Sequence, residues 1–326
     1  FAECSSYPTA CLRDVGRSSA VRFFAMAHRH FWHMGSGFRD DLLGQRYMSD
    51  AQPRPRALIL ASGDPASDPR IGWVAATLSQ RFDVIELGAH RDRALRRKPD
   101  WTALEKGRWR ARIPITPWPA HVPDLGKETY GGNVGWFALA GFAYDMLGLH
   151  ATLAAKKTRV SLAKRQRLHQ MKEILATNAS LIRAGRALGP MDLIVAADLD
   201  ALAAGVVLKH DLGARLVYDA HEFWPFSFPI FVGTDEEQAW VRIERLLVRE
   251  TDARLTVSTG LAEEMGKTYG APFQAIPNAV PLAESPTPPP RRVRTDGKVE
   301  FLFLGGFAPD RGILQLIKAW QQTPSN

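Results

Sequence analysis

Three ionisable side chains follow directly on an apolar stretch near the middle of the chain. Leu216–Tyr218 is apolar, and Asp219, His221 and Glu222 come next in the sequence. Of the three, only the histidine has an ordinary pKa close to neutrality, so it can donate a hydrogen bond to a hydroxyl or phosphate group of a ligand. Asp219, His221 and Glu222 are therefore candidate catalytic residues. The alternative is a polar loop whose side chains cap the next element.

A second segment has the residue types of an anion site. The sequence SGDPASDPRIG, residues 62–72, contains Gly63, which lets the backbone approach a ligand closely, and Arg70 at the start of an expected helix. A helix N-terminus offers free N–H groups and a partial positive charge. We expect Gly63 and Arg70 to bind phosphate, and a simple β–α loop is the alternative. No GxGxxG motif occurs here, which disfavours a dinucleotide-binding fold.

A third segment near the C-terminus has a similar arrangement. In LGGFAPDRGI, Gly305 and Gly306 end an apolar run and Arg311 precedes an expected helix. An arginine and a helix N-terminus can neutralise the charge that grows on a diphosphate leaving group without a metal ion. Gly305, Gly306 and Arg311 are therefore candidate phosphate ligands.

Two groups of residues resemble metal ligands, but each has a simpler interpretation. Asp198 and Asp200 have the spacing of a metal-binding Asp-x-Asp motif, and helix capping is the commoner role for carboxylates that open a helix. His28, His30 and His33 lie close together without nearby carboxylates, which favours an amphipathic helix. We expect no metal and no other cofactor.

The composition is that of a globular protein of about two domains. The chain has 326 residues with 45% apolar and 23% charged content, and its net charge of +8 suggests an acidic partner, namely nucleic acid, an anionic membrane or a phosphate-bearing substrate. Cys4 and Cys11 fit no zinc or redox spacing, which indicates a reducing compartment. The longest apolar candidate, 135–155, is interrupted by Asp145 and His150, so we expect no membrane-spanning helix.

Strands and helices alternate along most of the chain. Apolar runs typical of strands lie at 57–60, 83–87, 192–197, 215–220, 253–258 and 273–278, and helical spacing follows at 69–80, 202–210, 235–250 and a stretch that ends near Gly270. This order predicts an α/β fold, a Rossmann-like parallel sheet with helices on both faces. Ligands of such sheets bind outside the carboxyl ends of the strands, where Asp219, His221 and Glu222 would lie.

The same pattern divides the chain into parts. Residues 1–55 form a poorly determined, partly helical extension, and 56–280 form the α/β domain, which has a helical basic insertion at about 88–190. Residues 281–298 are proline-rich and charged, as in a linker. Residues 299–326 repeat the strand–glycine–helix order, so we expect the first β–α unit of a second, truncated Rossmann-like domain.

The insertion is basic and contains tryptophans. Its second basic block has no acidic residue between Lys156 and Lys172, and Trp101, Trp109 and Trp118 lie in or near its first block. A lipid-linked acceptor at an anionic membrane would suit this composition, and a solvated helical hairpin would suit it nearly as well.

Taken together, these segments resemble glycosyltransferase family 4, the retaining sugar transferases of GT-B fold. The matching stretches are DPRIGWVAATL (68–78), YDAHE (218–222), LTVSTGLAEEM (255–265), IPNAVP (276–281) and FLFLGGFAPDRGI (301–313). They follow the family's order and cover about 57–80 and 192–321.

The resemblance implies two Rossmann-like domains that face each other across a cleft, with the acceptor mainly on the first and the nucleotide-sugar on the second. His221 would be the family's active-site histidine, and Asn278 would lie at the hinge or cleft. Gly306 and Arg311 occupy the positions of the family's basic phosphate-binding pair, of which only Arg311 keeps the charge. The family's glutamate pair would lie beyond Asn326, so we expect this chain to be inactive by itself.

The resemblance further implies that the partners are a nucleotide-sugar and a glycan or lipid-linked acceptor, and that the protein is cytoplasmic or peripheral on the inner face of the cell membrane. Two other functions stay open. A nucleotide-sugar epimerase of the same fold would need acid/base carboxylates, for which Asp219 and Glu222 are available. A basic binding module without enzymatic activity, for nucleic acid, would need its basic residues on the sheet or on a recognition helix. The basic blocks lie mostly in the insertion, away from the predicted sheet, so we expect no nucleic-acid partner.

Overall fold

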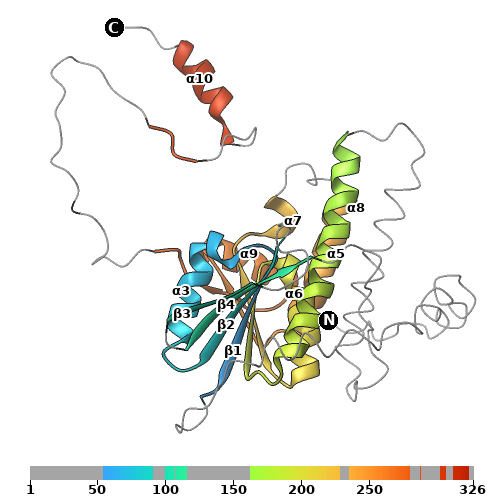
Figure 1. Cartoon of the computed structure of the whole chain (residues 1–326). Helices are drawn as coiled ribbons and strands as arrows, with labels where there is room; N and C mark the ends of the chain where they lie inside the picture. The colour runs from blue at the N-terminus through green and yellow to red at the C-terminus, as the bar shows by residue number, and fades with distance from the viewer. Residues whose placement is uncertain are drawn as a thin grey trace, which may run out of the picture.

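The computed structural model of the chain contains one eight-stranded sheet with helices on both faces (Figure 1). The structure describes residues 54–90, 100–105, 107–115, 162–227, 235–279, 287, 302–305 and 311–322. Within 162–172 and at 235–236 it describes the backbone but not the side chains. The predictions for residues 1–53, among them the His28, His30 and His33 group, lie outside the described residues.

The strand order is β3-β4-β2-β1-β5-β6-β7-β8. The strands are β1 (Arg56–Ala61), β2 (Asp83–His90), β3 (Asp100–Glu105), β4 (Arg108–Pro114), β5 (Leu193–Ala197), β6 (Arg215–Ala220), β7 (Ala253–Thr256) and β8 (Gln274–Ala275). Every neighbouring pair is parallel except β3 and β4. The predicted Rossmann-like parallel sheet is therefore confirmed.

The helices connect these strands. They are a 3-10 turn η3 (Pro65–Ser67), α3 (Pro69–Leu78), α5 (Leu162–Leu188), α6 (Leu199–Leu212), α7 (Trp224–Ser227), α8 (Asp235–Val248), α9 (Thr259–Tyr269) and α10 (Ile313–Gln321). Asp68 caps α3 by accepting a hydrogen bond of 2.9 Å from the N–H of Arg70, and Pro69 occupies the first turn, as the sequence predicts.

Two apolar clusters hold the layers together. On one face, α3 packs Ile71 and Ala75 against β1 and β2. On the other face, α5 and α6 pack against the sheet and against each other, and α8 adds Trp240, Ile243 and Leu247 to the same cluster. Figure 1 shows α3 and the α5–α6 pair on opposite sides of the strands. Because both faces of β1 are covered, its sequence is apolar without alternation from Ala57 to Ala61.

The order of the strands creates a switch point beside β1. The chain leaves β1 toward β2 on one side, through α3, and returns to β5 on the other side, through α5. The loops that follow β1 and β5 therefore diverge from neighbouring strand ends. In open α/β sheets, ligands bind at this point, outside the carboxyl ends of the strands.

Part of the region predicted as a helical insertion is a strand pair. Within 88–190, β3 and β4 form an antiparallel hairpin, and the helix α5 begins only at Leu162. The sequence RWRARIP alternates, with Ala111 and Ile113 buried in the core. The arginines at the alternate positions face carboxylates. Arg108 and Arg110 bind Glu86, and Arg112 binds Asp100 and Asp64. This two-residue period is what separates a strand from a helix, and the surplus of arginine masks it.

The arginines of the hairpin therefore form ion pairs within the domain, and its tryptophans pack against the apolar core. Trp101 and Trp109 pack against the main apolar cluster, and Trp118 lies outside the described residues. Among the residues that the structure describes, no helix is long and apolar enough to cross a membrane. The stretch 135–155 is not among them.

The C-terminal part is described only in short pieces. The predicted helix is present as α10, with Gly312 in the left-handed conformation at its start. The strand expected within 299–306 is not formed at 302–304, where none of the described strands pairs with it. Large apolar side chains of both pieces are exposed, namely Leu302, Leu304, Leu314, Leu316, Ile317 and Trp320.

A glycine in β2 sets how closely the loop after β1 packs on the sheet. A Cβ on Gly88 would meet the carbonyl oxygen of Gly63 and the ring of Pro65 far inside van der Waals distance. We expect Gly88→Ala to reduce the free energy of unfolding by about 1–3 kcal/mol, as overpacking typically does. Urea denaturation followed by circular dichroism measures this change.

Gly72 in α3 provides the matched control, because a Cβ there meets nothing within 4 Å. Gly72→Ala should stabilise the protein slightly, since alanine is the better helix former. Equal stability of the two variants would contradict the close approach of the loop to β2.

Candidate functional site

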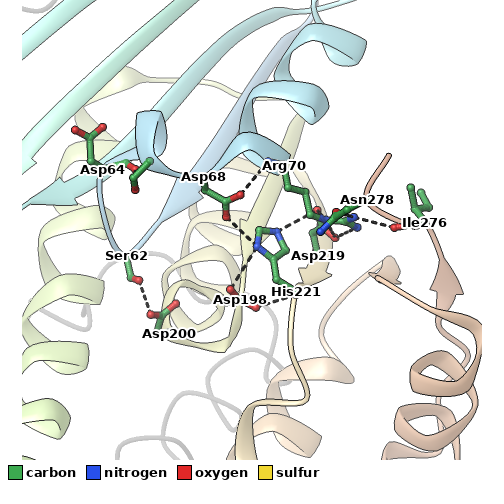
Figure 2. A network of polar contacts seen from close by, with 11 residues as sticks. Ser62, Asp64, Asp68, Arg70, Asp198, Asp200, Asp219, His221, Ile276 and Asn278 are labelled. Carbon is green, nitrogen blue, oxygen red and sulfur yellow. Dashed lines mark hydrogen bonds and ion pairs between the residues drawn. The ribbon is translucent and has the colours of Figure 1, made fainter. Parts of the chain in front are cut away.

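The polar residues of the carboxyl edge gather around the switch point. They come from the loop after β1, from the start of α3, from the ends of β5 and β6, and from the segment after β8 (Figure 2). We call Asp68, Arg70, Asp198, Asp219 and His221 the edge cluster. Its members come from three separate stretches of the sequence, 68–70, 198 and 219–221, which the parallel sheet brings together.

Arg70 and Asp219 form the buried centre of the edge cluster. The Nε of Arg70 lies 3.1 and 3.0 Å from the two carboxylate oxygens of Asp219, and its Nη2 donates a hydrogen bond of 2.6 Å to Oδ1. The two side chains are only 5% and 2% exposed. Breaking such a buried pair by removing one partner typically costs about 3–5 kcal/mol, because the other charge is left uncompensated.

The remaining terminal nitrogen of Arg70 reaches a different part of the chain. Nη1 donates hydrogen bonds of 2.8 Å to the carbonyl oxygen of Ile276 and 2.9 Å to Oδ1 of Asn278. Each nitrogen of the guanidinium thus has a partner within the protein, and Figure 2 shows the side chain lying between Asp219 and the segment after β8. The structure does not test phosphate binding by Arg70, which stays a prediction.

His221 lies at the carboxyl end of β6 among three carboxylates. Its Nδ1 is 2.9 Å from Asp68 and 3.5 Å from Asp198, and its Nε2 is 3.5 Å from Asp219. The ring is 13% exposed, so it is neither in the apolar core nor free in solvent. Nδ1 is engaged with Asp68, whereas Nε2 is buried at a distance from Asp219 that is too long for a hydrogen bond.

The surrounding carboxylates decide the charge of the histidine. Burial lowers the pKa of His221, but contacts with Asp219 and Asp68 and the charge of Asp198 outweigh burial and raise the pKa to about 10. The hydrogen bond from His221 also lowers the pKa of Asp68. His221 is therefore an imidazolium at neutral pH, a donor of hydrogen bonds and positive charge rather than a base.

Asp198 holds the loop after β6 from an unusual backbone conformation. Its φ of 61° and ψ of 168° lie in a region that residues other than glycine rarely adopt. Its carboxylate accepts a hydrogen bond of 2.8 Å from the backbone N–H of His221. Burial raises the pKa of Asp198 to about 6. Asp198 begins α6 but makes no capping hydrogen bond with its side chain, so capping does not explain this residue.

Asp200, the other carboxylate of the Asp-x-Asp motif, points to the loop after β1. It accepts a hydrogen bond from the hydroxyl of Ser62, and burial raises its pKa to about 7. Asn178 of α5 fixes this turn of α6, because it donates to the carbonyl of Asp200 and accepts from the N–H of Ala204. Among the described residues, no group of three or more histidine, cysteine, aspartate or glutamate side chains could hold a metal ion.

The aromatic residues after His221 anchor the loop in the core. The ring of Phe223 packs edge-to-face on Tyr269 at 5.8 Å, and Trp224 packs on Trp240 of α8 at 6.4 Å. This contact explains why aromatic side chains follow the ionisable ones directly. The chain must return to the core within two residues of the edge cluster, which limits the freedom of His221.

A buried carboxyl group supports β6 from behind the edge cluster. Glu244 of α8 accepts hydrogen bonds of 2.8 Å from the hydroxyl of Tyr218 and 2.6 Å from that of Tyr269. Its side chain is fully buried, and burial raises its pKa to about 8. Glu244 is therefore protonated at neutral pH and links β6 to α8 and α9.

The other predicted site residues differ in how the structure places them. Gly63 is exposed, and a Cβ there would meet nothing within 4 Å, so its surroundings leave room for a ligand. Glu222 is exposed beside the cluster and its charge contributes to the raised pKa of Asp198. Arg311 lies just before α10, Gly305 is described without regular structure, and Gly306 lies outside the described residues.

Sequence reasoning did not identify Asp68 and Asp198 as neighbours of His221. Asp68 has a sufficient local role as the cap of α3, and Asp198 resembles a cap or a metal ligand. The available signal was that DPR and DAHE each place an acid two residues before a base, and that both motifs follow strands whose carboxyl ends a parallel sheet brings to one edge.

The family comparison agrees with the motifs. Residues 142–284 match Glycosyltransferase Family 4, which confirms the predicted resemblance. Three of the quoted motifs, YDAHE, LTVSTGLAEEM and IPNAVP, lie within this range, which also contains Asp198, Asp219 and His221. No curated protein matches the chain at a significant level.

Solved structures with a similar arrangement include two synthases. An α,α-trehalose-phosphate synthase (UDP-forming) from Burkholderia vietnamiensis is 15% identical, with 66% of this chain and 42% of that chain covered and a TM-score of 0.37. A sucrose-phosphate synthase from Thermosynechococcus elongatus is 14% identical, with 70% and 49% covered and a TM-score of 0.38. The chain thus spans less than half the length of these structures.

The charge state of His221 can be tested through its carboxylate neighbours. Asp68→Asn removes the negative charge nearest to Nδ1, so we expect it to lower the pKa of His221 by about one to three pH units. NMR titration of histidine-labelled protein measures this value. Asp64→Asn is the control, because Asp64 lies in the same loop but binds Arg112. A pKa near 6.5 for His221 in the wild type would overturn the assignment.

Glu244 predicts a pH dependence of stability. Its pKa is about 8 in the folded protein and about 4.5 ordinarily, so the folded state keeps a proton that the unfolded state releases between these values. Glu244 therefore stabilises the folded state fully at pH values below its ordinary pKa. As the pH rises from there to about 8, the free energy of unfolding falls by about 1.4 kcal/mol per pH unit at most.

Glu244→Gln removes this titration while keeping the shape of the side chain. Urea denaturation of both proteins between pH 5 and pH 8 should give a shallower dependence in the variant. Parallel curves for the two proteins would show that Glu244 does not titrate in this range.

Proposed function

Because residues 142–284 match glycosyltransferase family 4, we propose that this protein transfers a sugar from a nucleotide-sugar donor to an acceptor. The product is a glycan, a polysaccharide or a glycolipid, and the anomeric configuration is retained. The observation that carries the proposal is the edge cluster, which places an imidazolium at the switch point of the sheet. This imidazolium belongs to His221, which lies inside the matched segment.

In this proposal His221 acts through charge and hydrogen bonding. A group with a pKa of about 10 is a poor base at neutral pH, but it can stabilise negative charge near the transferred sugar. Contacts with Asp68 and Asp198 fix the ring, so its orientation costs little when the substrate binds. Glu222 is exposed next to His221 and is available to substrate hydroxyl groups.

The diphosphate of the donor is assigned to the second unit. Gly305, Gly306 and Arg311 precede the N-terminus of α10, where free N–H groups and an arginine would meet the leaving phosphate. The bond between the sugar and the diphosphate breaks while the acceptor hydroxyl forms a new bond on the same face. The leaving phosphate takes the proton of that hydroxyl, so neither a metal ion nor a carboxylate nucleophile is required.

The epimerase alternative is less well supported. Asp219 would have to exchange protons, but its contacts with His221 and Arg70 outweigh burial and lower its pKa. Asp198, with a pKa of about 6, is the member of the edge cluster best suited to proton exchange. An epimerase would convert the nucleotide-sugar without an acceptor, so product analysis in the absence of acceptor distinguishes the two reactions.

A lipid-linked acceptor remains part of the proposal, and α5 is the element that favours it. Its 27 residues make it about 40 Å long, whereas a five-residue strand such as β5 spans about 17 Å. Leu188, at its C-terminus, accepts a hydrogen bond from Arg56 at the amino edge of β1, so α5 begins at the carboxyl edge. Figure 1 shows its first turns extending past the sheet, and residues 164–172 of these turns include four lysines or arginines.

The proposal is tested by replacing the imidazolium in the full-length enzyme. We expect His221→Ala to lower the rate of sugar transfer on the order of 10²-fold or more. His221→Asn, which keeps a donor near Nδ1 but carries no charge, should lose most of the same activity. Transfer is measured by the release of nucleoside diphosphate, and the anomeric configuration of the product by NMR.

His210→Ala is the matched control, since His210 also has a carboxylate partner, Glu250, but lies at the end of α6 on the opposite edge of the sheet. It should retain wild-type transfer. Folded His221 variants with wild-type turnover would remove this residue from the site.

A further inference from the structure

We propose that Arg70 is a positioning residue that couples the orientation of the Asp219–His221 pair to the position of the segment Ile276–Asn278. This inference rests on the proposed function for its consequence in catalysis. It goes beyond that function because it makes the activity of the histidine depend on a segment that carries no reacting group.

The contacts of Arg70 divide between two parts of the chain. Nε and Nη2 face Asp219 at the end of β6, and Nη1 faces the carbonyl of Ile276 and the side chain of Asn278. The guanidinium is planar and rigid, so its two edges cannot move independently. A shift of the segment after β8 therefore tilts the edge that holds Asp219.

Asp219 passes this tilt to the histidine through its charge. Its carboxylate accepts the hydrogen bonds of Arg70 at 2.6–3.1 Å and lies 3.5 Å from Nε2 of His221, close enough to attract the imidazolium without a hydrogen bond. The other side of the ring is held by Asp68, which also accepts the N–H of Arg70 at 2.9 Å. The four residues thus form a closed ring of contacts, in which Asp68, the cap of α3, returns to Arg70 through the backbone N–H.

The segment itself is weakly held by the sheet. β8 has two residues and, of the described strands, pairs with β7 alone, and Ile276 adds a backbone hydrogen bond of 2.7 Å to Thr256. Ile276 is 43% exposed. Residues 281–298, which the sequence predicts to be a linker, follow shortly after. Among the contacts between described residues, the two hydrogen bonds from Arg70 therefore add to one short strand pairing in fixing the segment, and a shift of the segment would reach Arg70 directly.

Arginine is required at this position for a geometric reason. A lysine could keep the charge opposite Asp219, but its single ammonium group cannot bind both oxygens of the carboxylate and reach Ile276 and Asn278 on the other side. The buried pair would survive in Arg70→Lys while the coupling would be lost.

The decisive variant is Asn278→Ala in the full-length enzyme. Asn278 is exposed, so its truncation leaves the buried pair and the sheet in place. We expect it to change the ring NMR signals of His221 at pH 7 and to lower kcat on the order of tenfold with little change in KM, since one hydrogen bond to a charged group is lost. Arg70→Lys should shift the same signals and lower kcat further.

Gln274→Ala is the matched control, because Gln274 is exposed in β8, directly before the segment, and is not among the hydrogen-bond partners of the Arg70 guanidinium. It should leave both the His221 signals and kcat unchanged. If Asn278→Ala behaves like this control while the wild type transfers sugar, the coupling is absent and the proposed function stands. If the His221 signals respond but the wild type transfers no sugar, the coupling is present and the proposed function fails.

Discussion

A buried arginine–aspartate pair joins the two halves of the sheet at its carboxyl edge. The start of α3 supplies Arg70, the end of β6 supplies Asp219, and β1 and β5 separate them in the sheet. Neither charge could be buried alone, because desolvation of an unpaired ion costs several kcal/mol. The pair is therefore a geometric condition on the fold: the loop after β1, the end of β6 and the segment after β8 must all lie within reach of one guanidinium.

The same condition explains the electrostatics around the histidine. Asp219 faces both Arg70 and His221, and Asp68 and Asp198 have only His221 as a cationic neighbour in the edge cluster. These three carboxylates are why the imidazolium keeps its proton. The cluster as a whole carries at least as much negative as positive charge. It is better suited to uncharged hydroxyl groups than to a diphosphate, in agreement with a division in which the second unit binds the phosphates.

The sequence predicts the sheet better than it predicts the site. Apolar runs such as 57–60, and the cap Asp68 with the first-turn Pro69 of α3, are local signals, and each predicts its element correctly. The hairpin β3–β4 is misread because its arginines balance carboxylates of other strands, among them Glu86, which no local pattern contains. Likewise His221 is recognised from its place after a strand, whereas its contact with Asp68 bridges about 150 residues and requires the strand order.

The hairpin at the far edge has a consequence for how the molecule behaves in a crowded solution. β3 runs antiparallel to β4 and is mostly exposed. Its pairing shifts register between Ala103 and Glu105. An irregular edge with a charged end offers a poor template for a strand of another molecule. The parallel strands, which form slowly and are prone to association while incomplete, are thus shielded on this side by a short local unit that can close by itself.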